Sequence, residues 1–288
     1  MPASGEAAVA HDGFWHRARR HPSFVLGGTL VACLVLSALV ALFWTPWPVA
    51  EIDIPNKLAR PTAAHWLGTD SLGRDIASQL LAGSHSSLLV GFIAVGMGLS
   101  IGGALGLIAA ARSGWVDEAI MRLSDFAFAF PALLLAIMLT AIYGPGLVVS
   151  ITAIGIFNIP VFARVTRGAA QSVWTREFIL AAQAAGKGRW RITLDHVLPN
   201  IASVLIVQTT VQFAIAILAE AALSYLGLGT MPPQASWGRM LNEAQAQMFQ
   251  APWLAIYPGV AIALAVLGLN LMGDGLRDLL DPRLARRR

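Results

Sequence analysis

The chain has 288 residues, of which 56% are hydrophobic and only 12% are charged, and its mean hydropathy is +0.65. A soluble domain carries about 25% charged residues, so this composition excludes a cytosolic globular enzyme as the first expectation. The formal net charge is +4, but the basic residues fall in short stretches between long apolar runs, which indicates membrane topology and argues against nucleic-acid binding. The single cysteine, Cys33, permits no intrachain disulfide.

Six apolar stretches are long enough for membrane spans, because a bilayer core about 30 Å thick requires roughly 20 helical residues. In chain order they cover residues 24–44, 88–111, 126–143, 147–162, 201–225 and 253–272. The fourth stretch is short and holds Asn158 and Pro160, so its inner boundary is the least well defined of the six. The sequence therefore predicts an all-helical membrane protein with six spans.

The first stretch follows three arginines, Arg17, Arg19 and Arg20, and the four residues that end at Cys33 resemble a lipoprotein cleavage site. Because the apolar run continues to Trp44, we expect an uncleaved transmembrane helix instead. Basic residues resist translocation in short loops, and 16 of the 20 Lys and Arg residues fall on one side if the N-terminus is cytoplasmic. Both termini are therefore predicted to be cytoplasmic.

An outer segment, residues 45–87, lies between the first two predicted spans, and its polar residues include Asp70, Gly73, Arg74 and Asp75. Asp70 is expected to cap a short surface helix, since aspartate accepts hydrogen bonds from the first backbone N–H groups of helices. The segment is predicted either to form a folded cap on the helix bundle or to offer a surface to an extracellular partner.

The second predicted span carries glycine at every fourth position, at Gly98, Gly102 and Gly106. Small residues at this spacing allow two helices to approach closely. Met97 lies in the same run, which therefore indicates helix packing rather than a ligand site.

The longest predicted cytoplasmic loop, residues 163–200, is expected to hold two short helices. Residues 177–185 are good helix formers, and the Gly-Lys-Gly sequence that follows supplies a break. In residues 189–198 the apolar side chains recur at helical spacing, and Pro199 is expected to end this second helix. The stripe consists of Trp190, Leu194, Val197 and Leu198. The pattern fits a helix seated in the groove of a partner protein and equally fits an amphipathic hairpin at the membrane surface.

Within the predicted spans, Glu220 is the one clear ionisable residue, and it is expected near the outer boundary of the fifth. Its predicted role is either a contact at an outer gate or at an interface with another membrane chain, or a structural anchor. Gln208 and Gln212 are one helical turn apart, so they share a face that could line a polar path between two membrane chains or form interhelical hydrogen bonds. Asn270, near the inner end of the last span, has the same two interpretations.

Several catalytic and binding chemistries are not supported by the sequence. A phosphate-binding loop requires Gly, four residues, then Gly-Lys-Ser/Thr, and the sequence around Gly186 has Ala181 and Gly188 at two of these positions. Hydrolysis of ATP is therefore assigned to other chains. Ser84 and His85 lack the acidic partner of a hydrolase. The histidines of the N-terminal tail recur every five residues, which is not the spacing of a helical metal site, so no metal is predicted.

Four ordered motifs resemble the C-type permease of dipeptide, oligopeptide and nickel ABC importers. They are Ala181-Ala182 with Gly186 and Leu198-Pro199; residues 65–75 (HWLGTDSLGRD); residues 218–229 (LAEAALSYLGLG) with Pro232-Pro233 and Ser236-Trp237-Gly238; and residues 270–278 (NLMGDGLRD) with 281–283 (DPR). Together they cover most of the chain from residue 65 to residue 284.

This resemblance implies that the cytoplasmic loop seats a helix in a cleft of an ATPase subunit. The residues assigned to this coupling loop are Glu177, Leu180, Ala181, Ala182, Gly186, Lys187, Arg189, Leu198 and Pro199. The family pattern usually begins with Glu where this chain has Leu180, and it usually has a basic residue where this chain has Asp195. A charged contact to the ATPase is therefore either missing or moved to Glu177, Lys187 or Arg189.

The resulting expectation is an all-α integral membrane protein with six transmembrane helices and the MetI-like fold of type I ABC importer permeases. Residues 1–64 are assigned to the N-terminal tail, the first helix and the start of the outer segment, and residues 65–288 to a five-helix permease core. The chain is expected to import di- and oligopeptides together with a second permease, ABC ATPases and an extracytoplasmic binding protein. It is placed in the bacterial inner membrane, without nucleic acid or a cofactor of its own, and with ATP and Mg²⁺ bound by the ATPases. A permease for nickel or another small solute is the alternative, ahead of a channel or an intramembrane enzyme.

Overall fold

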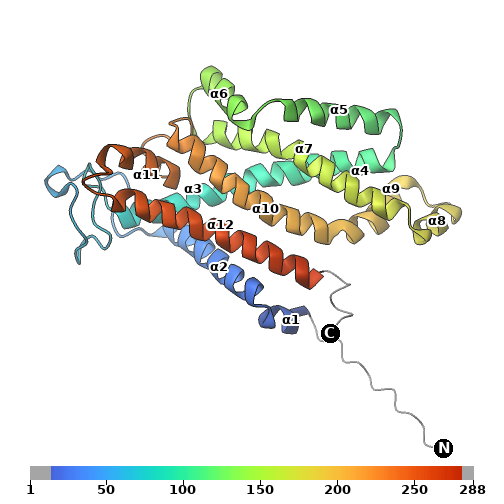
Figure 1. The fold of residues 1–288 in the computed structure, drawn as a ribbon, viewed down its shortest axis with the longest axis horizontal. Helices are drawn as coiled ribbons and strands as arrows, with labels where there is room; N and C mark the ends of the chain where they lie inside the picture. Colours follow the sequence, from blue (N-terminus) through green and yellow to red (C-terminus); the bar gives the residue numbers. More distant parts are fainter. Residues whose placement is uncertain (1–13, 281–288) are drawn as a thin grey trace, which may run out of the picture.

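A computed structural model describes residues 14–280, which form an elongated bundle of helices with the termini of the described chain at one end (Figure 1). The α-helices are α1 (Phe14–Arg20), α2 (Pro22–Phe43), α3 (Ile76–Met97), α4 (Gly103–Ala111), α5 (Trp115–Ala129), α6 (Ala132–Tyr143), α7 (Leu147–Trp174), α8 (Glu177–Ala184), α9 (Arg189–Ile192), α10 (Leu198–Tyr225), α11 (Trp237–Ala244) and α12 (Trp253–Leu280). Two π-helical turns, η2 (Gly98–Gly102) and η3 (Thr193–Val197), join α3 to α4 and α9 to α10, while η1 (Ile54–Asn56) and η4 (Gln245–Gln247) are short 3-10 helices. The far N-terminal tail and the motif at 281–283 lie outside the described residues.

Five helices among the described residues are long and apolar enough to cross a membrane. They are Pro22–Phe43, Ile76–Ala111, Leu147–Trp174, Arg189–Tyr225 and Trp253–Leu280. The second therefore begins twelve residues before the predicted residue 88, and two of the five contain a π-helical turn. A sixth candidate is the pair α5 and α6, which is bent by 79°.

The prediction of one continuous helix over residues 126–143 is wrong. Pro131 interrupts it, because proline restricts the preceding residue to extended backbone, and Phe130 has φ −91° and ψ 119°. The first half of the predicted span belongs to the amphipathic helix α5, which begins at Trp115 and lies along α7 (Figure 1).

Neither Pro160 nor Pro199 ends a helix, although the sequence predicted that Pro199 would. α7 continues through Pro160 to Trp174, so the connecting loop begins twelve residues later than predicted. Pro199 lies in the first turn of α10, two residues after the end of the π-helical turn η3. The wider turn loosens the backbone hydrogen bonds that proline would otherwise disrupt, and the side-chain amide of Asn200 donates to the His196 carbonyl at 2.7 Å.

Glycines allow the spanning helices to pack backbone against backbone. A Cβ atom added at Gly102 would lie 2.2 Å from the carbonyl oxygen of Ile159, and one at Gly106 would lie 2.5 Å from that of Ala163. This places the predicted glycine stripe against α7. α2 packs on α12 in the same manner, because a Cβ at Gly27 would lie 2.3 Å from the backbone nitrogen of Met272.

The two ends of the bundle carry different structures (Figure 1). α8 and α9 lie at one end, beyond the last turns of α4 and α7. The segment between α2 and α3 folds at the opposite end beside α11. These two ends contain most of the residues that the sequence singles out as functional.

Candidate functional site

The structure contains a short helical hairpin, residues 175–197, which we call the docking hairpin. It rests on the bundle through Ile179 and Ile192, which are fully buried in one apolar cluster with Val173 and Val197. The side of the hairpin that faces away from the bundle carries four large apolar side chains that are 42–59% exposed. They are Phe178, Leu180, Trp190 and Leu194.

The predicted apolar stripe is divided by this arrangement. Val197 is buried against the bundle, whereas Trp190 and Leu194 are exposed. The π-helical turn η3 inserts one extra residue per turn, so residues on either side of it do not keep the 3.6-residue register assumed from the sequence. The prediction of one continuous stripe is therefore wrong.

Gly186 ends α8 in a conformation that favours glycine. Its φ is +79°, the Lys187 N–H donates to the Ala182 carbonyl at 3.1 Å, and the Gly186 N–H donates to the Gln183 carbonyl at 2.9 Å. These are the two hydrogen bonds of a Schellman cap. Gly186, which was predicted to allow the close approach of a partner, therefore also ends the helix. Ala181 and Gly186 are both exposed.

The docking hairpin is attached to a second spanning helix through Arg189. Its guanidinium donates to the Ala111 carbonyl at the C-terminus of α4, at 3.1 Å, where a cation also interacts favourably with the helix dipole. Arg112 lies over the Trp190 ring, 5.7 Å from its centroid. The hairpin is thus tied to α4 as well as to α7 and α10.

Asp195, which stands where the family usually has a basic residue, pairs with basic residues of the same hairpin. Asp195 lies 3.6 Å from Arg191 and 3.9 Å from Lys187, and the Lys187 ammonium lies 3.0 Å from His196 Nε2. Lys187 and Asp195 are both partly exposed. Glu177 is exposed at the start of α8, and Pro199 is exposed beside the half-buried Leu198.

At the other end of the bundle, Asp75 rather than Asp70 caps α3, so that prediction is wrong. The Asp75 carboxylate accepts from the Ser78 N–H and hydroxyl, both at 2.8 Å, and lies 3.0 Å from His65 Nδ1. Asp70 instead accepts from the backbone N–H groups of Leu72 and Arg74 and so closes a turn. Asp70 lies five residues too early in the chain to reach the first turn of the helix.

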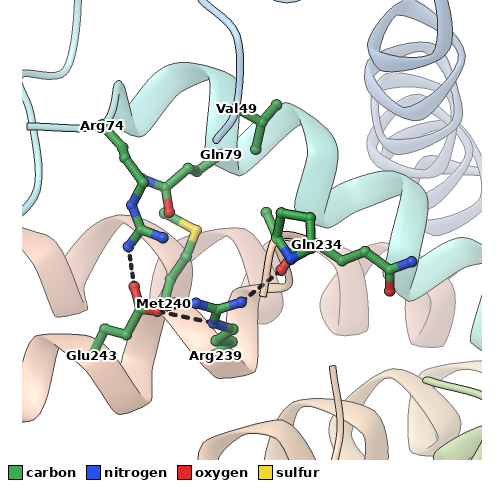
Figure 2. Close-up of a pocket in the computed structure, with 9 residues that line it drawn as sticks. Val49, Arg74, Gln79, Gln234, Arg239, Met240 and Glu243 are labelled. Carbon is green, nitrogen blue, oxygen red and sulfur yellow. Dashed lines mark hydrogen bonds and ion pairs between the residues drawn. The ribbon is translucent and has the colours of Figure 1, made fainter. Parts of the chain in front are cut away.

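Arg74 is the centre of a charged network between this segment and α11 (Figure 2). Its guanidinium donates to Asp70 at 2.7 Å and forms an ion pair with Glu243, which also accepts from Arg239 at 2.6 and 2.9 Å. Burial opposes the charged form of Arg74, but attraction to Asp70 and Glu243 outweighs it and raises its pKa above the ordinary value. Gln79 donates to Asp70 at 2.9 Å.

We call residues 45–75 together with α11 and the connection 226–236 the outer cap. Gly73 has φ +81°, and a Cβ there would lie 1.8 Å from the Asp53 carbonyl, so a glycine is required at this turn. Ser86 donates to the Ala235 carbonyl at 2.8 Å, and Trp237 Nε1 donates to that of Leu80 at 3.0 Å. The outer cap is therefore fixed to α3.

Glu220 is fully buried, and its carboxylate is surrounded by hydroxyl groups of this chain. It accepts from Ser224 at 2.7 Å, from Thr230 at 3.3 Å and from Ser87 at 3.4 Å. These donors come from α10, the outer cap and α3, so Glu220 joins three segments.

The remaining predicted polar residues are not brought together. On α10, Gln212 is buried and Gln208 is half-buried, whereas Asn270 is exposed on the C-terminal half of α12. Among the described residues, no group of three or more His, Cys, Asp or Glu side chains could hold a metal ion.

The sequence analysis missed two ion pairs that join α5 to α7. Arg167 pairs with Asp117, and Arg164 pairs with Asp125 while it also lies over the Phe128 ring at 4.4 Å. Asp117 and Asp125 are 50 and 39 residues away from their partners in the sequence. The polar spacing of α5 was visible in the sequence, but its position beside α7 was not.

A bundle of membrane-length helices, with an apolar hairpin tied to three of them at one end and a rigid cap at the other, has the form of a transport permease. The chain belongs to the family of binding-protein-dependent transport system inner membrane components, whose model matches residues 102–286. The model for the N-terminal TM domain of oligopeptide transport permease C matches residues 12–61. The predicted resemblance to C-type permeases is thereby confirmed.

Named relatives agree with this assignment. The chain is 43% identical to the glutathione transport system permease protein GsiD of Pectobacterium atrosepticum over 94% of its own length and 90% of the relative. It is 44% identical to the dipeptide transport system permease protein DppC of Alkalihalophilus pseudofirmus, over 90% of its length and 86% of the relative.

A comparison with solved structures identifies the fold. A chain of the MetNI methionine ABC transporter, solved in inward-facing conformations, matches with a TM-score of 0.60 and 18% identity, over 70% of this chain and 97% of that one. The protein is therefore an all-helical membrane protein with a MetI-like fold and five or six candidate spans. It is the permease subunit of an ABC importer, and its family implies ATPase and substrate-binding partners.

Proposed function

We propose that the chain moves di- and oligopeptides across the bacterial inner membrane, along a path that it forms with a second, related permease. The cargo is inferred from the two named relatives, which transport glutathione and dipeptides. Six spans with both termini cytoplasmic are proposed, with the bent pair α5 and α6 as one span. In this orientation, 16 of the 20 basic residues lie in cytoplasmic segments or in the cytoplasmic halves of the spans, which supports it.

The docking hairpin is the observation that carries the proposal. It presents Phe178, Leu180, Trp190 and Leu194 to a partner at the end of the bundle where α4, α7 and α10 converge. An apolar patch of this kind on a membrane-transport subunit fits a groove in an ATPase. The outer cap lies at the opposite end, where an extracytoplasmic binding protein would deliver its peptide.

Coupling follows from the continuity of the helices. α7 ends one residue before the hairpin, and α9, η3 and α10 form one 37-residue helix that leads away from it. A displacement of the hairpin by closure of the ATPases would therefore be transmitted along these helices as a rigid-body movement. The path would then alternate between outward and inward access. ATP and Mg²⁺ are bound by the ATPases in this scheme, and the chain itself contributes no cofactor site.

The test is reconstitution of the chain with its second permease, ATPases and binding protein in proteoliposomes. Uptake of a labelled dipeptide should require ATP and rise at least tenfold with the binding protein. The purified chain alone should hydrolyse no ATP. Uptake without nucleotide, or hydrolysis by the isolated chain free of contaminating ATPase, would contradict the proposal.

The contribution of apolar contact to docking can be tested at Leu180, which is 56% exposed. Leu180→Glu restores the residue usual in the family, but it places an unpaired carboxylate in an apolar contact, which costs several kcal/mol if no cation faces it. We expect reduced co-purification of the ATPase, whereas Gln183→Glu, at an exposed polar position on the same helix, should retain it. Improved association of Leu180→Glu would show that the ATPase keeps a basic partner for this position.

A further inference from the structure

α5 has two distinct exposed faces. One carries Trp115, Leu123, Phe126 and Phe130 and is apolar. The other carries Glu118, Arg122 and Asp125, which are spaced by four and three residues and therefore lie on one side of the helix. Glu118 and Arg122 pair with each other at 2.6 Å, and both are mostly exposed.

α7 extends the polar face through Arg164. Its guanidinium pairs with Asp125, and the two side chains are 48% and 64% exposed. We call Glu118, Arg122, Asp125 and Arg164 the polar stripe. By contrast, the Arg167–Asp117 pair between the same two helices is largely buried, with side chains 30% and 15% exposed.

The depth of the Arg164–Asp125 pair decides what can cover it. Arg164 lies ten residues before Trp174, the inner end of α7, and Asp125 lies ten residues after Trp115, the inner end of α5. Each is therefore about 15 Å along the helix axis from that end. α7 is about 42 Å long, so about 6 Å of it extends beyond each side of a 30 Å hydrocarbon core if it is placed symmetrically. The pair then lies about 9 Å inside the core.

An exposed ion pair at this depth is not compatible with contact to lipid tails, because charged groups in hydrocarbon are strongly unfavourable. Water in a cavity or another polar surface must cover it. The adjacent apolar face of α5 suits contact with lipid or with a packed partner helix. The polar face therefore points to the interior of the transporter and the apolar face to its periphery.

We infer that the polar stripe lines the water-filled inner half of the translocation path, where the Arg164–Asp125 pair opens to compensate the carboxylate and ammonium ends of a passing peptide. A neutral pair leaves no net charge in the empty path. When a zwitterionic peptide arrives, each member exchanges its partner for the opposite charge on the peptide. This inference rests on the proposed peptide cargo, but the lining of the path can be tested separately from it.

The lining is tested with single cysteines in a Cys33→Ser background of the assembled transporter. Ala129→Cys lies on the polar side of α5 and Ala119→Cys on its apolar side, and both alanines are exposed in this chain. Ala119 is four residues from the inner end of α5 and Ala129 is fourteen, so Ala129 is the deeper of the two. A small charged methanethiosulfonate should nevertheless label Ala129→Cys at least tenfold faster. Slower or equal labelling, or a crosslink from Ala129→Cys to the second permease, would overturn the inference.

The role of the pair is tested by transport. Arg164→Gln and Asp125→Asn should each lower dipeptide uptake at least tenfold, with an unchanged amount of assembled complex and basal ATP hydrolysis within twofold. The swap Asp125→Arg with Arg164→Asp should recover uptake to within threefold, because both charges remain in the path. Asp117→Asn, at the buried pair, should instead reduce the amount of assembled complex.

Normal uptake in Arg164→Gln and Asp125→Asn would overturn the role of the pair. A swap that stays as impaired as the single variants would overturn it as well, because both charges would then be present in the path without restoring uptake. Failure of the proposed function is distinguishable from both results, since the parent transporter would then show no dipeptide uptake while the cysteine labelling could still be measured.

Discussion

Gly186 and Gly188 lie on either side of Lys187 in the docking hairpin, but only one of them needs to be glycine. Gly186 has φ +79°, in the left-handed region, whereas Gly188 has φ −67°. A Cβ at either position would meet no atom within 4 Å, so sterics with the rest of the chain do not distinguish them. Their backbone conformations do.

Gly186→Ala should therefore destabilise the hairpin by about 1 kcal/mol, the usual cost of a non-glycine residue in the left-handed region. Gly188→Ala is the matched control and should change stability by less than about 0.5 kcal/mol. The measurement is the thermal stability of the purified complex, together with the fraction of ATPase that co-purifies. Equal effects of the two substitutions would show that the Schellman cap does not limit the hairpin.

Arg74 joins the carboxylates of Asp70 and Glu243, which come from distant parts of the sequence. Glu243 is 169 residues away from Arg74. The Arg74 side chain is 11% exposed and that of Glu243 is 29% exposed, so the pair is less accessible to solvent than an ordinary surface ion pair. Removing the guanidinium would leave Asp70 and Glu243 close to each other without their shared cation.

Arg74→Gln should lower stability by about 2 kcal/mol, below the range for fully buried pairs because Glu243 keeps some contact with solvent. Arg60→Gln, at an exposed position of the same outer segment, should have an effect near zero. The readouts are the melting temperature and the stimulation of ATP hydrolysis by the binding protein. A loss of less than 0.5 kcal/mol in Arg74→Gln would mean that the network does not hold the outer cap.

The sequence singled out Asp70, Arg74 and Asp75 as polar residues of the outer segment, but it could not show their partners. The capping residue was misassigned by five positions because an aspartate at either position is a residue type that caps helices, and only the fold shows which one reaches the Ser78 N–H. Glu243 gave no signal, because ion pairs between distant segments leave no periodic pattern in a single sequence.

At the scale of elements, close contact between α7 and the helix that runs from α3 to α4 determines the packing of the bundle. A Cβ at Gly102 would lie 2.2 Å from the Ile159 carbonyl oxygen, a backbone atom that cannot move alone. Gly96, six residues earlier, has nothing within 4 Å of such a Cβ.

Gly102→Ala should force the two helices apart and cost about 2–3 kcal/mol, the upper part of the range for overpacked cores. Gly96→Ala should be neutral or stabilise by up to about 1 kcal/mol, since alanine is the better helix former. Thermal stability in detergent and the amount of folded protein in the membrane would measure both. Equal tolerance of the two substitutions would exclude the close packing of α7 on Gly102.

Local sequence rules failed at prolines for an identifiable reason. Pro160 lies within a helix held by packing along its whole length, and Pro199 follows a π-helical turn that takes up the distortion. Pro131 did break its helix, although the apolar composition on both sides predicted one span. Hydropathy detects how much apolar sequence is present, but tertiary contacts decide whether a proline bends, ends or merely interrupts the helix.

For the molecule as a whole, composition and hydropathy were sufficient to predict a helical membrane protein, and four short motifs were sufficient to predict the family. Five of the predicted spans correspond to long apolar helices. In the six-span topology, the second, third and fourth spans lie between the outer segment and the docking hairpin. Because an odd number of spans separates these two segments, they lie at opposite ends of the bundle. The side that faces the cytoplasm rests on the asymmetry of charge alone.

Orientation can be tested at three exposed positions, so that the side of the membrane and not burial decides reactivity. Lys57 lies in the outer segment, Gln245 follows α11, and Lys187 lies in the docking hairpin. In a Cys33→Ser background of intact cells, a membrane-impermeant thiol reagent should label Lys57→Cys and Gln245→Cys but not Lys187→Cys. Permeabilised cells provide the control, in which all three should react. Since 16 of the 20 basic residues lie in the segments on the side of Lys187 or in the adjoining halves of the spans, the reverse orientation would place most of the positive charge towards the outside. Labelling of Lys187→Cys in intact cells would therefore contradict both the orientation and the assignment of the hairpin to the ATPases.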